Sequence, residues 1–512
     1  LSAEHLPESK TANAAETIDS NLNHRKDLLT KLGFGRNRLS QTIHHLILYP
    51  FFASLATPRA GQIPPMRENW RESFRWNPLL RQKRVPHPPP KNHLAKTADG
   101  GPRVKSSFRL QLPGVSLIMM KKGGEGMRVC GIIAEYDPFH QGHAYHLAQA
   151  RARTEADAVV CVISGSFTQR GLPALLPAHA RTEMALRCGA DVVVQLPYAF
   201  SVREAEYFAL GGVGILSALG CTHLAFGAET DDLSLLSRAA ALLEQPDAAF
   251  QTLLRAGLDG GLSHAAAMGR ALASALSVPS KQLQTPNTAL AISYLRALLR
   301  LGSPMTPVAV LRRGDYHESE PASLPSATAM RQALLRGDWQ SVRSGIPQAA
   351  LPVLERAALG GLLCPPDALD TALRQRLLMM RPEELAALPG VSEGLEQRLL
   401  AAARQGRSRE EMLALAKTRR YTAGRLSRIL CHALCGVTAA DLPAAPAYAR
   451  LLGFRESVRP LLRQMQRGPL PLISRPAREE GRMALDLRAD ALWAIGAGLP
   501  LGDSYRQRPI ML

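Results

Sequence analysis

The chain has 512 residues, of which 46% are hydrophobic and 21% charged, so it can form two or three globular domains and is not disordered as a whole. Its formal net charge of +19 divides into +11 over residues 1–126 and +8 over the remainder. The second value suits a partner rich in phosphates, although a solvated basic surface has the same composition. No segment approaches the ~20 apolar residues of a membrane span, which predicts a protein without membrane association.

Residues 1–126 begin with Leu1 and mix Pro-rich and basic pieces without sustained periodicity. The apolar run from Ile43 to Leu55 contains Pro50 and lies too far from the start to be a typical signal peptide. We expect residues 1–126 to be a disordered or spurious N-terminal extension, with translation starting at Met120 or Met127.

From Met127 onward, short apolar runs rich in β-branched residues alternate with segments of helical periodicity. The runs are Arg128 to Ala134, Ala158 to Ser164, Asp191 to Leu196, Thr222 to Phe226 and Pro307 to Leu311, with a helix expected from Pro286 to Leu301. This alternation predicts an α/β fold with a Rossmann-like parallel sheet over residues 127–335.

After about residue 335, Leu, Ala, Arg and Glu recur at helical spacing, which predicts a helical, basic domain over residues 336–512. The turn at Leu388-Pro389-Gly390 is an ordinary interhelical turn or a helix-hairpin-helix turn that contacts phosphates. Cys431 and Cys435 are four residues apart on an expected helix, where two buried thiols are favoured over a ligand pair. No C-x2-C pair is present, so we predict no metal site and a reducing cytoplasm.

The most specific motif is His140-Gln141-Gly142-His143, at the expected junction of the first strand with a helix. A helix N-terminus presents free N–H groups and partial positive charge to a phosphate, and Gly142 allows close approach of a nucleotide. Positioned donors of this kind stabilise the charge that develops during nucleotidyl transfer. His140 and His143 are therefore predicted to be catalytic. The alternative is that they and His146 are surface residues or a chance metal-like cluster.

A second phosphate-binding element is expected where Ser326-Ala327-Thr328-Ala329-Met330-Arg331 opens a helix. Hydroxyl donors, helix N–H groups and a guanidinium can hold the distal phosphates of ATP and the departing pyrophosphate, which predicts catalytic roles for Ser326 and Arg331. The alternative is an ordinary Ser N-cap followed by a solvated Arg.

The sequence resembles the bacterial tRNA(Met) cytidine acetate ligases of the H-x-G-H nucleotidyltransferase superfamily, from Met127 almost to Leu512. The matching blocks are residues 135–143, Ser164 to Gly171, Phe226-Gly227, Pro286-Asn287, Arg312-Arg313 with Tyr316-His317, and Lys417 to Thr422. The resemblance implies that acetate attacks the α-phosphate of ATP to give acetyl-adenylate and pyrophosphate. The acetyl group then passes to N4 of the wobble cytidine of elongator tRNA(Met), giving N4-acetylcytidine and AMP.

The resemblance also implies the ATP contacts, with Mg²⁺ expected as the accompanying ion. They are Ile133, Ala134, Glu135, Tyr136, Asp137, Pro138, Phe139, His140, Gln141, Gly142, His143, Ala144, Tyr145, His146, Gly227, Asn287, Arg312 and Arg313. Gly227 would allow close approach at a strand end, and Asn287 would bind base or ribose. Taken singly, Gly227 and Asn287 also fit a tight turn and a helix N-cap, and Arg313 fits a solvated neighbour.

The sequence departs from the family pattern at three places. Asp137 and Gln141 stand where Asn is common, and Pro177-Ala178 replaces a polar or acidic residue followed by Lys. A carboxylate at residue 137 would repel phosphate unless it is turned away or helps to hold magnesium.

An RNA substrate requires cations along its backbone and stacking for an exposed base. Lys417, Arg419, Arg420, Arg425 and Arg428 surround Tyr421, and a second basic stretch contains Arg455, Arg459, Arg463 and Arg467. Charge runs of this kind are also typical of solvated helix faces. Two other functions stay open, namely adenylyl transfer to a small phosphorylated metabolite, and RNA binding by a protein whose nucleotide site has decayed. The sequence does not determine the oligomeric state.

Overall fold

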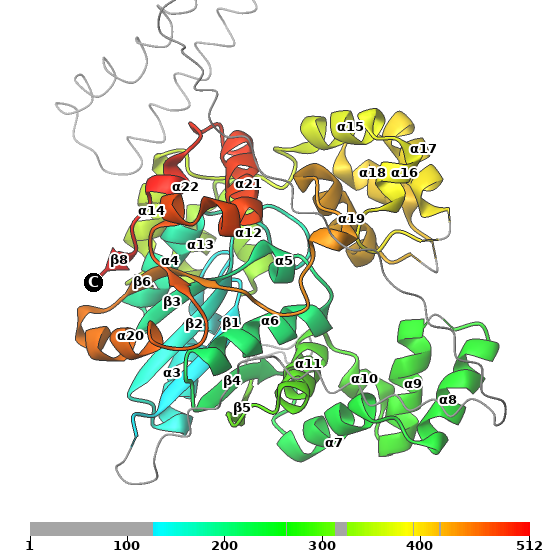
Figure 1. Ribbon diagram of the computed structural model, residues 1–512, viewed down its shortest axis with the longest axis horizontal. Helices are drawn as coiled ribbons and strands as arrows, with labels where there is room; N and C mark the ends of the chain where they lie inside the picture. The colour runs from blue at the N-terminus through cyan, green and yellow to red at the C-terminus, as the bar shows by residue number, and fades with distance from the viewer. Residues whose placement is uncertain (1–125, 263, 313–324, 393, 419–420) are drawn as a thin grey trace, which may run out of the picture. The chain divides into compact units, whose positions relative to one another are not determined.

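The computed structural model describes residues 126–512 except 263, 313–324, 393 and 419–420, so the predictions for residues 1–125, Arg313, Arg419 and Arg420 lie outside it. The described residues all belong to the same compact unit. Their centre is a sheet with the strand order β5-β4-β1-β2-β3-β6-β7, in which β8 pairs with β6 (Figure 1).

The five predicted strands form the parallel part of this sheet. They are β1 (Val129–Ala134), β2 (Ala158–Ser164), β3 (Val192–Leu196), β4 (His223–Ala228) and β5 (Thr306–Leu311). Val129 of β1 pairs with Ala158 of β2, and Gly227 of β4 pairs with Val310 of β5. Because all five strands are parallel, their carboxyl ends lie at the same edge, where ligands of such sheets bind. The predicted α/β fold is confirmed.

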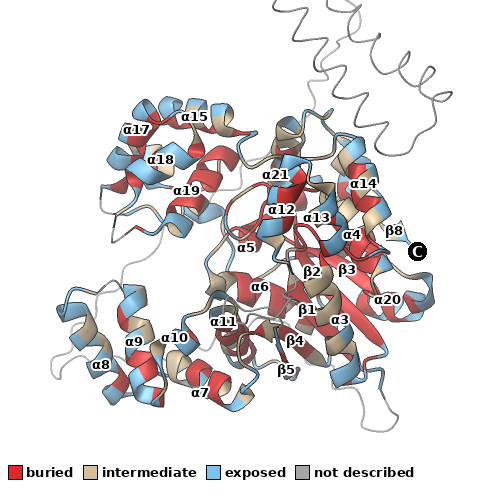
Figure 2. Cartoon of the chain, turned by 180° about the vertical axis from the view of Figure 1, so that it is seen from behind, coloured by how far each residue is buried: buried red, intermediate tan, exposed pale blue. Residues whose placement is uncertain are grey.

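Successive residues of each strand enter different hydrophobic cores, as the period of two requires. Val160 and Val162 of β2 pack with α6 (Ala205–Ala218), α7 (Leu233–Glu244) and α11 (Pro286–Leu301). The alternate residues Val159 and Cys161 pack with α3 (Gln141–Thr154) and α4 (Ala178–Arg187). The central strands β1, β2 and β3 are accordingly buried on both sides, and Figure 2 colours them red. Helix α11 has the bounds that its sequence pattern predicts.

The region after residue 336 is mainly helical, as predicted, and it also contains three strands that the sequence did not signal. Strand β6 (Ala449–Phe454) pairs antiparallel with β3, and β7 (Leu472–Ile473) and β8 (Ile510–Met511) pair with β6. The β6 sequence, Ala-Arg-Leu-Leu-Gly-Phe, contains no β-branched residue, so pairing with the buried strand β3 imposes a conformation that local propensity does not signal. The division into two domains between residues 335 and 336 stays a prediction.

A third core, of helical residues, follows the first two along the chain. It is built mainly from α15 (Asp370–Met379), α16 (Pro382–Ala386), α17 (Leu395–Gln405), α18 (Arg409–Ala416) and α19 (Ala423–Cys435), and it includes Phe167 and Tyr198. Cys431 and Cys435 are buried free thiols of α19, as predicted. Tyr198 belongs to α5 (Tyr198–Ser201), so this core includes residues of the sheet-bearing segment.

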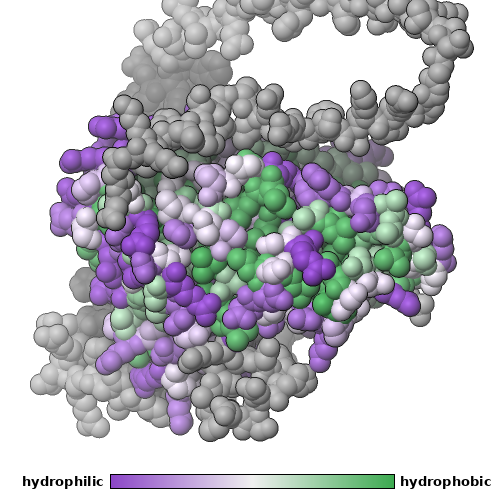
Figure 3. Space-filling view, turned by 90° about the horizontal axis from the view of Figure 1, so that it is seen from below, coloured by the Kyte–Doolittle hydropathy of each residue, from purple (hydrophilic) through white to green (hydrophobic). Residues whose placement is uncertain are grey.

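The remaining helices occupy connections between these parts. They are α8 (Ala248–Asp259), α9 (His264–Leu276), α10 (Ser280–Leu283), α12 (Ala327–Arg336), α13 (Trp339–Gly345), α14 (Leu351–Leu359), α20 (Arg459–Met465), α21 (Glu480–Gly496), α22 (Asp503–Arg506) and the 3-10 turns Ala439–Asp441, Glu456–Val458 and Pro476–Arg478. None of the described helices is long and apolar enough to cross a membrane. On the face shown in Figure 3, hydrophilic and apolar residues are interspersed where side chains are described.

Candidate active site

The H-x-G-H motif lies at the junction of β1 with α3, as predicted. His140 has extended backbone angles (φ −139°, ψ 176°) and is the N-cap of α3. Its Nδ1 accepts a hydrogen bond from the amide of Gly142 at 3.0 Å, and the His140 amide donates to Nδ1 of His143 at 3.3 Å. The two imidazole rings stack with centroids 3.8 Å apart. The first turn of α3 therefore fixes both histidines.

These contacts determine which ring nitrogens carry protons. A ring nitrogen that accepts a hydrogen bond carries no proton, so each neutral imidazole is protonated at Nε2. Burial lowers the pKa of His140 to about 4, and the nearby charges of Arg312 and Arg331 add to this effect. Burial, followed by the charges of His140 and Arg312, holds the pKa of His143 well below its usual value. Both residues are thus neutral Nε2–H donors at physiological pH.

His146, one turn further along α3, is in a similar environment. Burial lowers its pKa to about 4, and its buried Nε2 has no hydrogen-bond partner among the described residues. Within the same part of the chain, no group of three His, Cys, Asp or Glu side chains is placed to hold a metal ion. The three histidines therefore do not form the metal-like cluster that their spacing left open.

Helix α12 brings Arg331 to the loop before the H-x-G-H motif. Arg331 Nη1 donates to the carbonyl of Asp137 at 2.6 Å, and Nη2 donates to Thr328 Oγ1 at 3.0 Å. Ser326 is the N-cap of this helix, since its Oγ accepts from the amide of Ala329 at 3.2 Å. Its exposed position still allows its hydroxyl to donate outward.

Asp137 is turned into the protein. Its Oδ1 accepts from the amide of Leu175 at 2.7 Å, and its Oδ2 lies 3.6 Å from Nη1 of Arg331. Burial raises its pKa, although Arg181 and Arg331 act in the opposite direction. Because these contacts hold the carboxylate inside the protein, it is turned away and does not repel phosphate.

Gly227, Asn287 and Arg312 come together at the carboxyl ends of β4 and β5. Arg312 Nη1 donates to Asn287 Oδ1 at 3.3 Å, and a Cβ added at Gly227 would lie 3.4 Å from Cγ of Arg312. Asn287 is the second residue of α11 and not its N-cap, which is Thr285. The structure therefore gathers these three predicted contacts at the same sheet edge as β1.

Glu229, which the sequence analysis missed, orients Asn287. Its carboxylate accepts from Asn287 Nδ2 at 2.6 Å, from Thr285 Oγ1 at 2.7 Å, and from the amide and Oγ1 of Thr288 at 2.8 and 2.9 Å. Burial disfavours the charged form, but these hydrogen bonds together keep the pKa of Glu229 below its usual value. The available signal was an acidic residue three positions after the predicted strand Thr222 to Phe226.

Arg181 is a second missed residue, and it joins the ends of β1 and β2. Its side chain is fully buried and donates to the carbonyls of Leu176 at 3.0 Å, Glu135 at 2.7 Å and Ser164 at 2.9 Å, and also to that of Gly165. Burial lowers the pKa of Arg181, and the carboxylates of Asp137 and Glu135 oppose this shift. Its only sequence signal was its place on the buried face of α4.

The loop from Gly165 to Gly171 connects the motif with the helical core. The amide of Gln169 donates to Oε1 of Glu135 at 2.6 Å. At the other end of the loop, Ser427 Oγ of α19 donates to the carbonyl of Arg170 at 2.5 Å. Arg409 Nη2 donates to the carbonyls of Gly171 at 2.5 Å and Ser427 at 2.6 Å. Hydrogen bonds of two successive loop residues, Gln169 and Arg170, thus connect Glu135 with α19.

Ala178, where the family pattern has Lys, is the first residue of α4. It lines a cavity of about 490 Å³ together with Ser166 and Arg450. Two arginines line this cavity, and each is paired with a carboxylate: buried Arg450 with Asp490 at 2.9 Å, and Arg356 with Glu183 at 2.5 Å. The cavity therefore lacks the ammonium group that a lysine would supply.

The predicted RNA-binding residues differ in their environments. Lys417 is exposed after α18. Arg425 lies over Tyr421, 5.2 Å from the ring centroid, and its Nη2 donates to the carbonyl of Gly390 at 2.7 Å. Arg455 of the second basic stretch donates to the carbonyl of Leu186 at 2.7 Å, so it helps to hold α4. Arg425 of α19 thus braces the turn at Gly390, and contact of this turn with phosphates stays a prediction.

Comparisons with known proteins agree with this geometry. Residues 127–501 match the family model of the HIGH nucleotidyl transferases. Curated proteins named tRNA(Met) cytidine acetate ligase include those of Syntrophomonas wolfei subsp. wolfei, 36% identical over 68% of this chain and 87% of that protein, and Acetivibrio thermocellus, 37% identical over 68% and 88%. The protein of that name from Bacillus licheniformis is 36% identical over 72% of this chain and 92% of its own.

Solved structures show the same relationship. Crystal structures of Thermotoga maritima TmcAL, bound with alpha-thio ATP and in the apo form, align with TM-scores of 0.69 and 0.70 and are 29% and 30% identical in sequence. Both alignments cover 75% of this chain and all of the other. The chain therefore belongs to the HIGH nucleotidyl transferase family and, within it, to the tRNA(Met) cytidine acetate ligases.

Proposed function

We propose that the protein activates acetate with ATP and transfers the acetyl group to N4 of the wobble cytidine of elongator tRNA(Met). In the first step an acetate oxygen bonds to the α-phosphorus of ATP and pyrophosphate leaves. In the second step the cytidine amine takes the acetyl group, giving N4-acetylcytidine and AMP. The observation that carries the proposal is the pair of neutral Nε2–H donors, His140 and His143, at the N-terminus of α3.

The histidines serve the adenylation step as fixed donors. Negative charge grows on the phosphoryl oxygens during transfer, and preorganised donors in a water-poor site stabilise this charge. The partial positive charge of the α3 N-terminus adds to their effect. Tyr136 and Phe139 hold the ring of His143, with ring centroids 4.9 and 5.6 Å away. The donors therefore need little reorganisation during the reaction.

The other residues of the site hold the rest of the nucleotide. Arg331 and the hydroxyl of Ser326 contact the distal phosphates and the departing pyrophosphate. Asn287 and Gly227 contact the ribose or base, while Arg312 contacts phosphate. The charges of Arg312 and Arg331 both act on His140, which supports binding of one phosphate chain by all three side chains.

Magnesium accompanies ATP in this proposal. Mg²⁺ in nucleotide sites is usually held by substrate phosphates and water with one or two carboxylates. The carboxylate of Asp137 is already held by Leu175 and Arg331. We therefore assign the ion mainly to the phosphates, with no protein cage.

The RNA lies along the basic surface near α19. Lys417, Arg425 and Arg428, with Arg419 and Arg420, bind its phosphates. The hydrogen bonds that the loop from Gly165 to Gly171 makes to Glu135 and to Ser427 of α19 support this proposal, because they connect the helical core with the H-x-G-H segment. The reaction takes place in the cytoplasm, where tRNA is available.

The decisive experiment incubates the protein with ATP, magnesium, labelled acetate and elongator tRNA(Met), followed by digestion of the RNA. We expect labelled N4-acetylcytidine without acetyl-CoA, and none with His140→Ala. Acetyl-adenylate without labelled RNA would overturn the acceptor, and the absence of both products would overturn the adenylation chemistry.

A further inference from the structure

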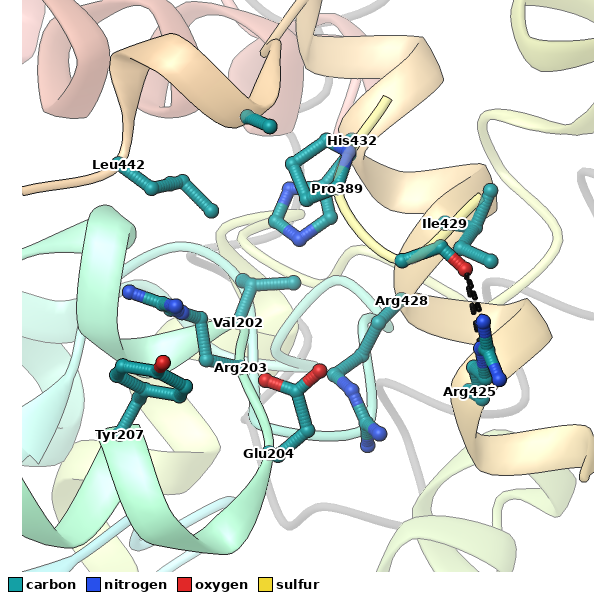
Figure 4. A pocket seen from close by; sticks show the side chains of 12 residues that line it. Val202, Arg203, Glu204, Tyr207, Pro389, Arg425, Arg428, Ile429, His432 and Leu442 are labelled. Atoms are coloured by element: carbon teal, nitrogen blue, oxygen red, sulfur yellow. Dashed lines mark hydrogen bonds between the residues drawn. The ribbon is translucent and has the colours of Figure 1, made fainter. Parts of the chain in front are cut away.

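A cavity of about 280 Å³ lies between the connection of α5 to α6 and the helix α19 (Figure 4). Its polar lining consists of Arg203 and Glu204 from this connection, Tyr207 from α6, and Arg425, Arg428 and His432 from α19. Apolar side chains such as Val202 and Leu442 complete the wall. The cavity therefore combines residues of the sheet-bearing segment with residues of the helical core.

The lining is strongly cationic. It contains three arginines and one glutamate, and none of these arginines forms an ion pair within 4.0 Å with a described carboxylate. Arg428 is half-buried, and its guanidinium makes no hydrogen bond to another described residue, although this group has five N–H donors. Burial lowers its pKa, and Glu204 and Arg425 act on it in opposite directions. An anion would satisfy these donors.

The other side of the cavity suits a planar ring. The guanidinium of Arg203 lies over the ring of Tyr207, 3.4 Å from the centroid. Planar arginine and aromatic groups are the surfaces on which unpaired bases of RNA stack. His432 contributes no charge at neutral pH, since burial lowers its pKa to about 4, and its Nδ1 is 3.3 Å from the hydroxyl of Tyr198.

The size of the cavity limits the occupant. Pockets for whole small ligands usually measure ~300 to 1,000 Å³, so a volume of about 280 Å³ suits one nucleotide of a larger molecule. Arg428 also lies against Gly171, since a Cβ added at Gly171 would be 2.9 Å from the Cα of Arg428. The cavity thus adjoins the loop that leads to Glu135.

We propose that this cavity holds one nucleotide of the single-stranded loop of the RNA, with its phosphate at Arg425 and Arg428 and its base against Arg203 and Tyr207. The inference rests on the proposed function and adds to it a base-holding site with residues outside the predicted RNA surface. A nucleotide held there anchors the loop while a neighbouring base enters the adenylation site.

The test measures binding of an RNA hairpin with the anticodon arm of elongator tRNA(Met) to the full-length protein over a range of salt concentrations. We expect Arg203→Gln and Arg428→Gln each to weaken binding about tenfold, and Arg428→Gln to reduce the salt slope by about 1. Arg428→Lys should retain the salt slope but recover only part of the affinity, because Lys lacks the planar fork. Arg238→Gln, an exposed arginine of α7, is the matched control and should bind as the wild type does.

Acetate-dependent exchange of pyrophosphate into ATP, measured without RNA, reports whether each variant retains a folded adenylation site. Loss of RNA affinity with exchange retained supports the inference. Unchanged affinity of both glutamine variants, or an equal loss in Arg238→Gln, overturns it. Displacement of the hairpin from this site by AMP alone would assign the cavity to a free nucleotide and also overturn it. If the wild type binds the hairpin but does not acetylate it, the proposed function fails while the cavity assignment stands.

Discussion

His140 uses its two ring nitrogens for different purposes. Nδ1 accepts the amide hydrogen of Gly142 and caps α3, which leaves Nε2 to carry the proton. An Asn side chain can place its oxygen near the position of Nδ1, whereas a Gln amide reaches the position of Nε2. The two substitutions therefore separate capping of the helix from donation to a phosphate.

We predict that His140→Asn keeps most of the stability but lowers the rate of ATP–pyrophosphate exchange about 10²- to 10³-fold, because a transition-state donor is lost. His140→Gln should keep more of the exchange activity but lose about 1 kcal/mol of stability with the cap. Exchange kinetics and urea unfolding of both variants test this. Equal activity of the two variants would contradict a donor role for Nε2.

The low pKa of His140 also predicts how stability depends on pH. The folded protein resists protonation of His140 down to about pH 4, whereas the unfolded chain takes up this proton near the usual value of 6.5. Lowering the pH therefore favours the unfolded state between these two values, and the effect levels off below the lower one. We expect this residue to contribute about 2 kcal/mol of the stability lost between pH 7 and pH 5. Urea unfolding at both pH values should show a smaller loss for His140→Gln, and an identical loss would refute the assignment.

At the scale of elements, the start of α11 shows how a helix terminus is made into a binding surface. Glu229 follows β4 and accepts hydrogen bonds from Thr285, Asn287 and Thr288 in the first turn of α11. Asn287 then presents its oxygen to Arg312. The carboxylate therefore determines which way the amide of Asn287 points.

We predict that Glu229→Gln raises KM for ATP about tenfold while kcat changes little. The new amide group would face the Asn287 amide donor, so Asn287 would have to flip and lose its bond to Arg312. The loss of a charge-assisted hydrogen bond should also cost about 1 to 3 kcal/mol of stability. Steady-state exchange kinetics test the first effect, and Asp231→Asn, which removes an exposed carboxylate nearby, should leave KM unchanged.

At the scale of the whole molecule, the loop ending at Gly171 connects adenylation with the helical core. Gly171 has a φ of +70°, and an added Cβ would lie 2.8 Å from the carbonyl oxygen of Ser427. Gly220 has a similar φ of +79° but open space around it. Alanine at these two positions thus causes similar backbone strain but different steric contacts.

We predict that Gly171→Ala reduces acetyl transfer to RNA at least about tenfold more than it reduces ATP–pyrophosphate exchange. The clash with Ser427 pushes the loop away from α19. Overpacking of this kind in a tightly packed interface is destabilising, so the contacts between the loop and α19 are weakened. Gly220→Ala should lose about 1 to 2 kcal/mol of stability from its backbone strain alone, with the ratio of the two activities unchanged. Parallel measurement of the two activities tests the coupling, and an unchanged ratio in Gly171→Ala would rule it out.

The sequence by itself determined the five parallel strands, helix α11 and the place of the H-x-G-H motif. These features depend on local patterns: apolar β-branched runs predict buried strands, and Pro286 and Gly302 mark the ends of α11. The order of the strands along the chain then places the motif at the carboxyl edge of the sheet. His140, His143, Arg331 and Asn287 were therefore predictable as members of one region.

Only the tertiary structure decided the contacts between residues far apart in the chain. Strand β6 lacks strand propensity and forms because it pairs with β3. The roles of Arg181 and Glu229 depend on the hydrogen-bond partners that surround them, and the cavity beside Arg428 requires Arg203, which is distant in sequence. Burial, pairing and the direction of a hydrogen bond depend on neighbours that a local pattern does not contain, so the fold had to supply them.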